Sequence, residues 1–226
     1  GDWYGITTEG TGQLLATGDT IVRYFQRVHS GALAANETWE ADVVHRVTGE
    51  VLVPSRVQLT VSPGAVIKVD DAQGVTVQTG GEMIAQGTSA KPIYVTSARD
   101  DTLGGDTNLD GDLTTPQPGD WRGFLTTGGQ ITLDHVFLRY GGGTANDVWS
   151  STGAALATAN GGSVLMANSR IQDPYFEGVI AWGSGEVIIT STVIAGADRG
   201  VNSDGTAVVN LTHCTLDDNR VGLYGH

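Results

Sequence analysis

A pattern that recurs about every 22 residues constrains the fold of this chain more than any other feature of its sequence. Each copy reads apolar, any, apolar, any, polar, small or apolar, any, apolar. Copies begin at Ile131, Val164, Val187 and Val209, so successive starts are 33, 23 and 22 residues apart. Because alternate strand residues point to the same side, stacked copies would bury their apolar positions in one column. The repeat therefore predicts a parallel β-solenoid with coils of about 22 residues.

The rest of the sequence also indicates an all-β protein. Short runs rich in valine, isoleucine and threonine alternate with glycine, asparagine and aspartate turns. An antiparallel sandwich would show such strands too, but it would not need the same inward pattern at a fixed spacing. The long interval between the first two copies predicts a corner loop around 144–151. About two further coils are expected from the N-terminal runs at 51–53, 57–61, 66–69, 75–77, 83–85 and 93–95.

The organisation of the chain is expected to be one β-helix domain spanning 1–226, cut from a longer protein. Residues 1–6 and 119–124 both contain a Gly-Asp-Trp-x-Gly block, and each block is followed by an Arg-Tyr pair, which favours a duplication. The competing interpretation is an amphipathic helix over 21–28 that caps the coil, because its apolar spacing is helical.

The charge of the chain excludes several classes of partner. A formal net charge of −13 is opposite to what binding to nucleic acid or to an anionic membrane surface requires. No apolar run approaches the ~20 residues of a membrane helix. The single cysteine, Cys214, excludes an internal disulfide. We therefore expect a secreted or cell-surface protein of bacterial type, with a trimmed cytoplasmic protein as the alternative.

Several segments resemble a known class of proteins. The runs at 51–54 and 61–68, those at 85–88 and 91–93, and the block at 119–124 resemble exported bacterial proteins with a right-handed parallel β-helix. That class is similar in architecture to pectate lyases and related polysaccharide-active enzymes. The resemblance covers most of the chain and implies the fold. It does not imply an activity, because one architecture hosts unrelated functions.

An acidic loop at 106–112 is the most specific chemical signal in the sequence. Calcium takes six to eight oxygen ligands, and alternate acidic or amide side chains on a tight loop supply several of them. The loop resembles the first half of an EF-hand, but Gln117 stands where the bidentate glutamate is expected. It is closer to the aspartate loops of dockerin-like or thrombospondin-like repeats. The predicted Ca²⁺ ligands are Asp106, Asn108 and Asp110, with Asp112 through its carbonyl, and Asp100, Asp101 and Asp120 as further candidates.

The same loop could instead be a solvated turn, since aspartate, asparagine and glycine favour turns without any ion. However, the chain has no lysine or arginine between Arg99 and Arg122 to offset the carboxylates. Crowded like charges are unfavourable unless a cation compensates them. We therefore predict a structural Ca²⁺ that holds a long insertion against the coils so that Trp121 can pack.

One template position is polar in every copy. It is occupied by His135, Asn168, Ser191 and His213, which would stack at a turn and satisfy backbone groups there. A histidine pair that binds a metal is the alternative, but two coils separate the histidines. Cys214 falls on a small position of the template and is expected to be buried and inert.

Candidate catalytic residues are few. A few short blocks resemble the Asn-Thr-Asp, Asp-Asp and Gly-His-Gly blocks that polygalacturonase-like enzymes carry on successive coils. The corresponding blocks in this chain contain Asp204, Asp217 and Asp218. Their spacing does not match the coil period, and fixed geometry is required for acid–base chemistry. We therefore expect a non-catalytic scaffold or adhesin that contacts polysaccharide or surface glycan and associates end to end. The alternatives are a polysaccharide lyase or hydrolase, and a carbohydrate-binding module with an aromatic platform. That platform would be drawn from Trp3, Trp39, Trp121, Trp149 and Trp182 with Tyr140 and Tyr175.

Overall fold

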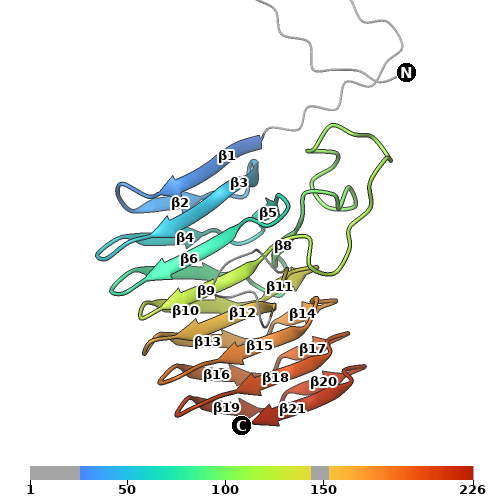
Figure 1. Ribbon diagram of the computed structural model, residues 1–226. Coiled ribbons are helices and arrows are strands. Elements are labelled where there is room, and N and C mark those ends of the chain that lie inside the picture. The colour runs from blue at the N-terminus through green and yellow to red at the C-terminus, as the bar shows by residue number, and fades with distance from the viewer. Residues whose placement is uncertain (1–25, 144–152, 226) are drawn as a thin grey trace, which may run out of the picture.

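The chain winds as a right-handed parallel β-helix in a computed structural model that describes residues 26–143 and 153–225 (Figure 1). In this described part all regular elements are strands, and no helix is long and apolar enough to cross a membrane. The strands are β1 (Gln26–Ala32), β2 (Glu37–Trp39), β3 (Val44–Val53), β4 (Gln58–Val61), β5 (Val66–Val69), β6 (Gly74–Gln78), β7 (Glu82–Gln86), β8 (Ile93–Ser97), β9 (Gly123–Thr127), β10 (Gln130–Asp134), β11 (Val136–Arg139), β12 (Ala154–Ala159), β13 (Ser163–Ala167), β14 (Arg170–Gln172), β15 (Glu177–Ala181), β16 (Glu186–Thr190), β17 (Val193–Ala195), β18 (Arg199–Ser203), β19 (Val208–Thr212), β20 (Thr215–Asp217) and β21 (Val221–Gly225).

The strands stack in three ladders that form the three faces of the solenoid. The first face is β5-β8-β11-β14-β17-β20, and the second is β6-β9-β12-β15-β18-β21. The long strand β3 bends to start both faces, pairing with β5 through its first half and with β6 through its second. The third face is β2-β4-β7-β10-β13-β16-β19. Neighbouring strands are parallel, which excludes the antiparallel sandwich.

The predicted apolar column is present. Leu138, Ile171, Ile194 and Leu216 occupy one register position on four successive coils. The first three of these side chains are fully buried, and Leu216 packs partly buried against them. One continuous cluster of buried side chains runs from Trp39 to Val201 along the solenoid axis. The fold is thus stabilised mainly by repeated burial of apolar side chains, each worth about 1.5–3 kcal/mol.

The four predicted polar residues occupy one corner, before the first face, as expected. Among the described contacts, however, their side chains make no hydrogen bond to the turn backbone, and the hydroxyls of the next residues, Ser169 and Thr192, do so instead. His135, Asn168, Ser191 and His213 share φ values between 48° and 53°, a left-handed conformation that turns the chain. The amides of the first three donate to carbonyls of the next coil at 2.9–3.2 Å. The expectation for Cys214 is wrong in one respect, because this thiol is only partly buried. In the described part of the chain no strand stacks beyond β19 and β20 to cover it.

Two expectations fall wholly or partly outside the described residues. These are the first Gly-Asp-Trp-x-Gly block and the corner loop around 144–151. The proposed helix over 21–28 is contradicted where it can be compared, because residues 26–28 belong to β1, which pairs in parallel with β3. The apolar spacing of this segment suits an amphipathic helix, but pairing with the backbone edge of β3 makes it a strand instead.

A long insertion interrupts the coil between β8 and β9. Residues 98–122 contain no strand, and they lie beside β5 and β8 on the first face of the solenoid (Figure 1). The acidic loop predicted from the sequence is the central part of this insertion.

Candidate metal site and outer groove

Outward-facing side chains of the first face hold the insertion in place. Arg46, Lys68 and Thr96 occupy one register position on β3, β5 and β8, and their side chains point away from the apolar core. On a bare solenoid these positions would face water. Here each of them contacts the insertion, so the stacking of coils builds a row of anchors.

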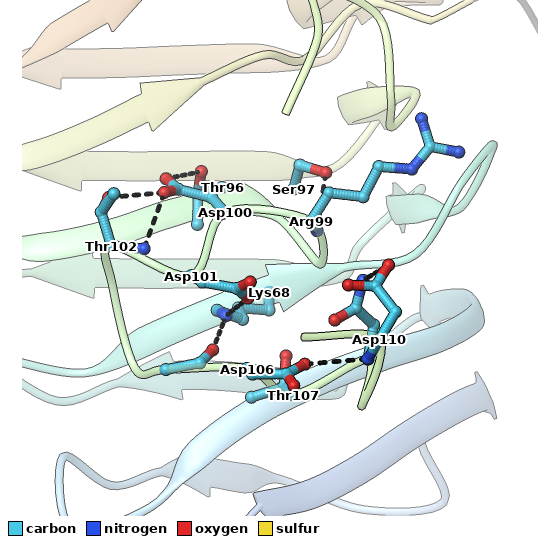
Figure 2. Close-up of polar contacts among 12 residues, drawn as sticks. Lys68, Thr96, Ser97, Arg99, Asp100, Asp101, Thr102, Asp106, Thr107 and Asp110 are labelled. Atoms are coloured by element: carbon cyan, nitrogen blue, oxygen red, sulfur yellow. Dashed lines mark hydrogen bonds and ion pairs between the residues drawn. The ribbon is translucent and has the colours of Figure 1, made fainter. Parts of the chain in front are cut away.

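Lys68 is the central anchor and is enclosed completely, with 0% of its surface exposed. Its Nζ donates to the carbonyl of Gly105, and it lies 3.7 Å from Asp101 Oδ1 (Figure 2). Burial lowers the pKa of Lys68, while the carboxylates of Asp101, Asp100 and Asp106 oppose this shift. A buried ammonium is tolerated only when such acceptors surround it.

Two arginines of the first face also anchor the insertion, one at its centre and one near its start. Arg46 donates from Nη1 to the carbonyl of Thr107 at 2.5 Å and holds Asp70 through two hydrogen bonds of 2.7 and 3.1 Å. Arg139 Nη1 lies 3.5 Å from Asp100 Oδ2. The expectation that no cation lies near the loop is therefore wrong for the folded chain. The counter-charges come from neighbouring coils rather than from neighbours in sequence.

The acidic loop folds around Asp106. Its Oδ1 accepts from the amides of Leu109 and Asp110 at 2.7 and 3.2 Å, and its Oδ2 accepts from Gly111 at 2.9 Å. Leu109 and Gly111 have φ values of 63° and 64°, so the turn is tight and left-handed at both positions. This arrangement brings the alternate side chains of the loop to one side.

Oxygen atoms converge inside this turn. The carboxylates of Asp101, Asp106 and Asp110 each place one oxygen within 4.8 Å of the others, the one such group of acidic, histidine or cysteine ligands among the described residues. Asn108 joins them by donating to Asp110 Oδ2 at 2.8 Å. Buried oxygens of Asn108 and Asp110 have no hydrogen-bond partner, and the buried Asp101 Oδ1 has only the Lys68 ammonium at 3.7 Å. Leaving such an acceptor unsatisfied costs about 1–3 kcal/mol, which a hard cation would offset.

Two other predicted ligands, Asp100 and Asp120, lie outside this group. The Asp112 residue is exposed, and its predicted role through the backbone carbonyl stays a prediction. The Asp100 carboxylate accepts from Thr96 and Thr102. Asp120 accepts from Ser97 at 2.6 Å and from Arg99 at 2.8 Å. The structure thus brings Asp101 to the oxygen group, whereas Asp100 and Asp120 brace the insertion through hydrogen bonds of their own.

The candidate catalytic aspartates are not brought together. Asp204 lies in the turn after β18, whereas Asp217 and Asp218 lie at the end of β20, before β21. Stacked strands of five residues separate these two corners, a span of roughly 17 Å. All three side chains are exposed. They form no carboxylate pair of the kind that glycoside hydrolysis uses.

The second face carries a groove that the sequence did not reveal. Leu125, Ala157 and Ile180 share an outward register position, yet 0–9% of their surfaces is exposed, and Trp182 packs against them. At one end of the groove Glu50 accepts from Thr76 at 2.8 Å and lies 3.5 Å from Arg122. The predicted tryptophan platform is wrong for Trp39 and Trp121, which are buried, while Trp3 and Trp149 lie outside the described residues.

At the other end of the same face lies a buried polar group. Glu177 on β15 accepts at Oε1 from Asn202 at 2.6 Å and from Arg199 at 3.3 Å. Burial raises the pKa of Glu177, and the bonds from Asn202 and Arg199 oppose the shift. The register offered a signal for this group, because Glu177 aligns with the apolar Ala154 of the preceding coil and Asn202 aligns with the apolar Ile180.

These features define a right-handed parallel β-helix protein with an acidic insertion on one face and a groove on another. The chain belongs to the family described as pectate-lyase-like beta helix domain, whose model matches residues 31–152, more than half of the 226 residues. No curated protein and no solved structure matches the chain. The β-helix part of the resemblance seen in the sequence is therefore confirmed, and the fold is of a polysaccharide-related type.

Proposed function

We propose that this chain is a non-catalytic β-helix scaffold of a secreted or cell-surface protein whose acidic insertion is stabilised by Ca²⁺. The observation that carries the proposal is the convergence of carboxylate oxygens from Asp101, Asp106 and Asp110. The three carboxylates and the Lys68 ammonium leave two formal negative charges, which one divalent cation would neutralise. End-to-end association of such modules stays a prediction.

The chemistry of the donors favours calcium over other ions. All three converging atoms are carboxylate oxygens, and the group contains no histidine or cysteine. Zinc and copper prefer nitrogen and sulfur ligands, and Mg²⁺ demands a near-ideal octahedron that an irregular loop rarely supplies. Calcium accepts variable geometry and a high ligand number.

Removal of calcium is expected to lower the melting temperature of the chain. Calcium at 100-fold above its Kd would contribute about 2.7 kcal/mol, or roughly 5–10 °C for a chain of this size. Differential scanning calorimetry with and without a saturating chelator measures the shift. An unchanged melting temperature counts against the proposal.

A matched pair of variants assigns that shift to the loop. Asp110→Asn removes a carboxylate from the oxygen group, and Asp112→Asn makes the same change at an exposed position two residues away. Only the first variant is expected to lose the calcium-dependent stabilisation. Equal losses in both would point to a general effect of net charge.

Glycan binding along the second face is a second candidate function. It is favoured by the pocket that Leu125 and Ala157 line together with the indole of Trp182, because aromatic and apolar surfaces stack well on sugar rings. A carbohydrate-binding module would show polymer-dependent quenching of tryptophan fluorescence without product. New reducing ends or unsaturated products from pectin or alginate would instead show an enzyme and overturn the non-catalytic assignment.

A further inference from the structure

Three polar side chains gather on the outer surface of β15 and β18, where the solenoid needs none. Glu177 and Arg199 share one register position, and Asn202 follows on the same strand as Arg199. The flanking coils place Ala154 and Val221 in register with Glu177 and Arg199, and Ile180 in register with Asn202. Alanine, valine and isoleucine therefore suffice for the fold at these positions.

The hydrogen bonding of this group is incomplete. Glu177 and Asn202 are 0% and 4% exposed. One oxygen of each, Glu177 Oε2 and Asn202 Oδ1, has no hydrogen-bond partner, and neither has Arg199 Nε. Buried polar groups are nearly always satisfied, so two acceptors and one donor left open at one place indicate a missing partner.

Aromatic rings border the group on its solvent side. The Arg199 guanidinium carbon lies 5.0 Å from the centre of the Phe176 ring and 4.1 Å from that of Tyr224. Tyr224 is 39% exposed, and the Arg199 side chain is 22% exposed. The arginine therefore separates the buried carboxyl of Glu177 from solvent, and a shift of this one side chain would open the group beside the Tyr224 ring.

We propose that Glu177, Asn202 and Arg199 form a binding subsite for a neutral sugar residue. Two ligand hydroxyls donate to Glu177 Oε2 and Asn202 Oδ1, and a ligand oxygen accepts from Arg199 Nε. The sugar ring packs on Tyr224 after the Arg199 side chain shifts. The inference deepens the second, glycan-binding candidate by naming its ligand class, and it is independent of the calcium proposal.

A neutral sugar fits this group better than a uronate. The formal charges of Glu177 and Arg199 already offset each other through their contact at 3.3 Å. Both open oxygens are acceptors, which a hydroxyl satisfies and a carboxylate repels.

Isothermal titration calorimetry of the full chain tests the proposal with cellohexaose, mannohexaose, xylohexaose and hexagalacturonate. At least one neutral hexasaccharide is expected to bind about ten-fold or more tightly than hexagalacturonate. Glu177→Gln, which keeps the size of the side chain, is expected to weaken that binding by about ten-fold or more. Glu186→Gln is the matched control, because Glu186 is exposed on β16 of the third face.

Several outcomes would overturn the subsite. They are binding of hexagalacturonate alone, binding of none of the four probes, and equal affinity of the wild type and Glu177→Gln. Tyr224→Ala should also weaken binding. This variant serves if Glu177→Gln does not fold, because Tyr224 is 39% exposed and belongs to the last strand described. The chelator experiment tests calcium binding separately. Failure of the sugar subsite would therefore not contradict the proposal of a calcium-stabilised scaffold.

Discussion

Replacing Trp121 by alanine is expected to lower the free energy of unfolding by about 3–5 kcal/mol. The indole is 0% exposed at the point where the insertion returns to the solenoid, and it meets the Phe124 ring edge-on at 5.5 Å between centroids. Its Nε1 donates to the carbonyl of Arg139 at 2.7 Å. The variant leaves both a cavity and an unsatisfied carbonyl, so two costs add.

Urea unfolding followed by circular dichroism measures this loss. Leu113→Ala is the control within the same insertion, because Leu113 is 86% exposed and should change stability by no more than about 0.5 kcal/mol. A loss below about 1 kcal/mol for Trp121→Ala would show that the insertion is not packed through this residue.

The fold could be predicted from the sequence because stacking is periodic. Residues such as Ile171 and Ile194 are 23 positions apart and must share a column when each coil repeats the last. The polar corner ladder follows from the same spacing. The prediction of a helix over 21–28 was wrong at residues 26–28 because local periodicity does not reveal the sheet edge with which this segment pairs.

The surroundings of the acidic loop could not be predicted in the same way. Lys68 and Gly105 are 37 residues apart, and Arg46 and Thr107 are 61 apart, separations set by an insertion of irregular path. A lone lysine at an outward strand position ordinarily faces water. In the folded structure the insertion covers Lys68, and the lysine therefore supplies the loop with a positive counter-charge.

The group around Glu177 lies between these two cases. Its partners sit about one coil apart, so a repeat alignment would have placed a carboxylate among alanine, arginine and valine at one position. Asp204, Asp217 and Asp218 near the C-terminus were instead the catalytic candidates in a chain expected to be non-catalytic. A polar exception within an apolar stack is the more informative signal in a solenoid, because the fold itself does not require it.

Acid is expected to destabilise the N-terminal coils through two buried histidines. His29 Nε2 and His45 Nδ1 share a hydrogen bond of 2.9 Å, and the Trp39 ring lies 4.2 Å and 5.2 Å from their ring centres. Burial, with the neighbouring His45, lowers the pKa of His29 to about 4, although Glu37 opposes the shift. Burial also lowers the pKa of His45, opposed by its bond to the Glu40 carbonyl.

The sign of the effect follows from proton binding. In the unfolded chain a histidine takes up its proton near pH 6.5, whereas folded His29 stays neutral until about pH 4. The unfolded state therefore binds more protons across this window, and stability falls as the pH drops through it. For His29 the loss between pH 7 and pH 4.5 amounts to about 2–3 kcal/mol. Arg27 adds to the effect, since its charge disfavours a second cation beside both rings.

The comparison of variants isolates this contribution from carboxyl groups that titrate in the same range. Burial raises the pKa of Asp71, Asp101 and Glu177, so these groups regain stability as the pH falls and would mask part of the loss. Urea unfolding at a series of pH values should give a shallower acid slope for His29→Gln than for the wild type. His213→Asn, at an exposed corner position, should keep the wild-type slope. If His29→Gln also keeps that slope, the buried pair is not the source of acid sensitivity, because glutamine retains the hydrogen bonding but cannot take up the proton.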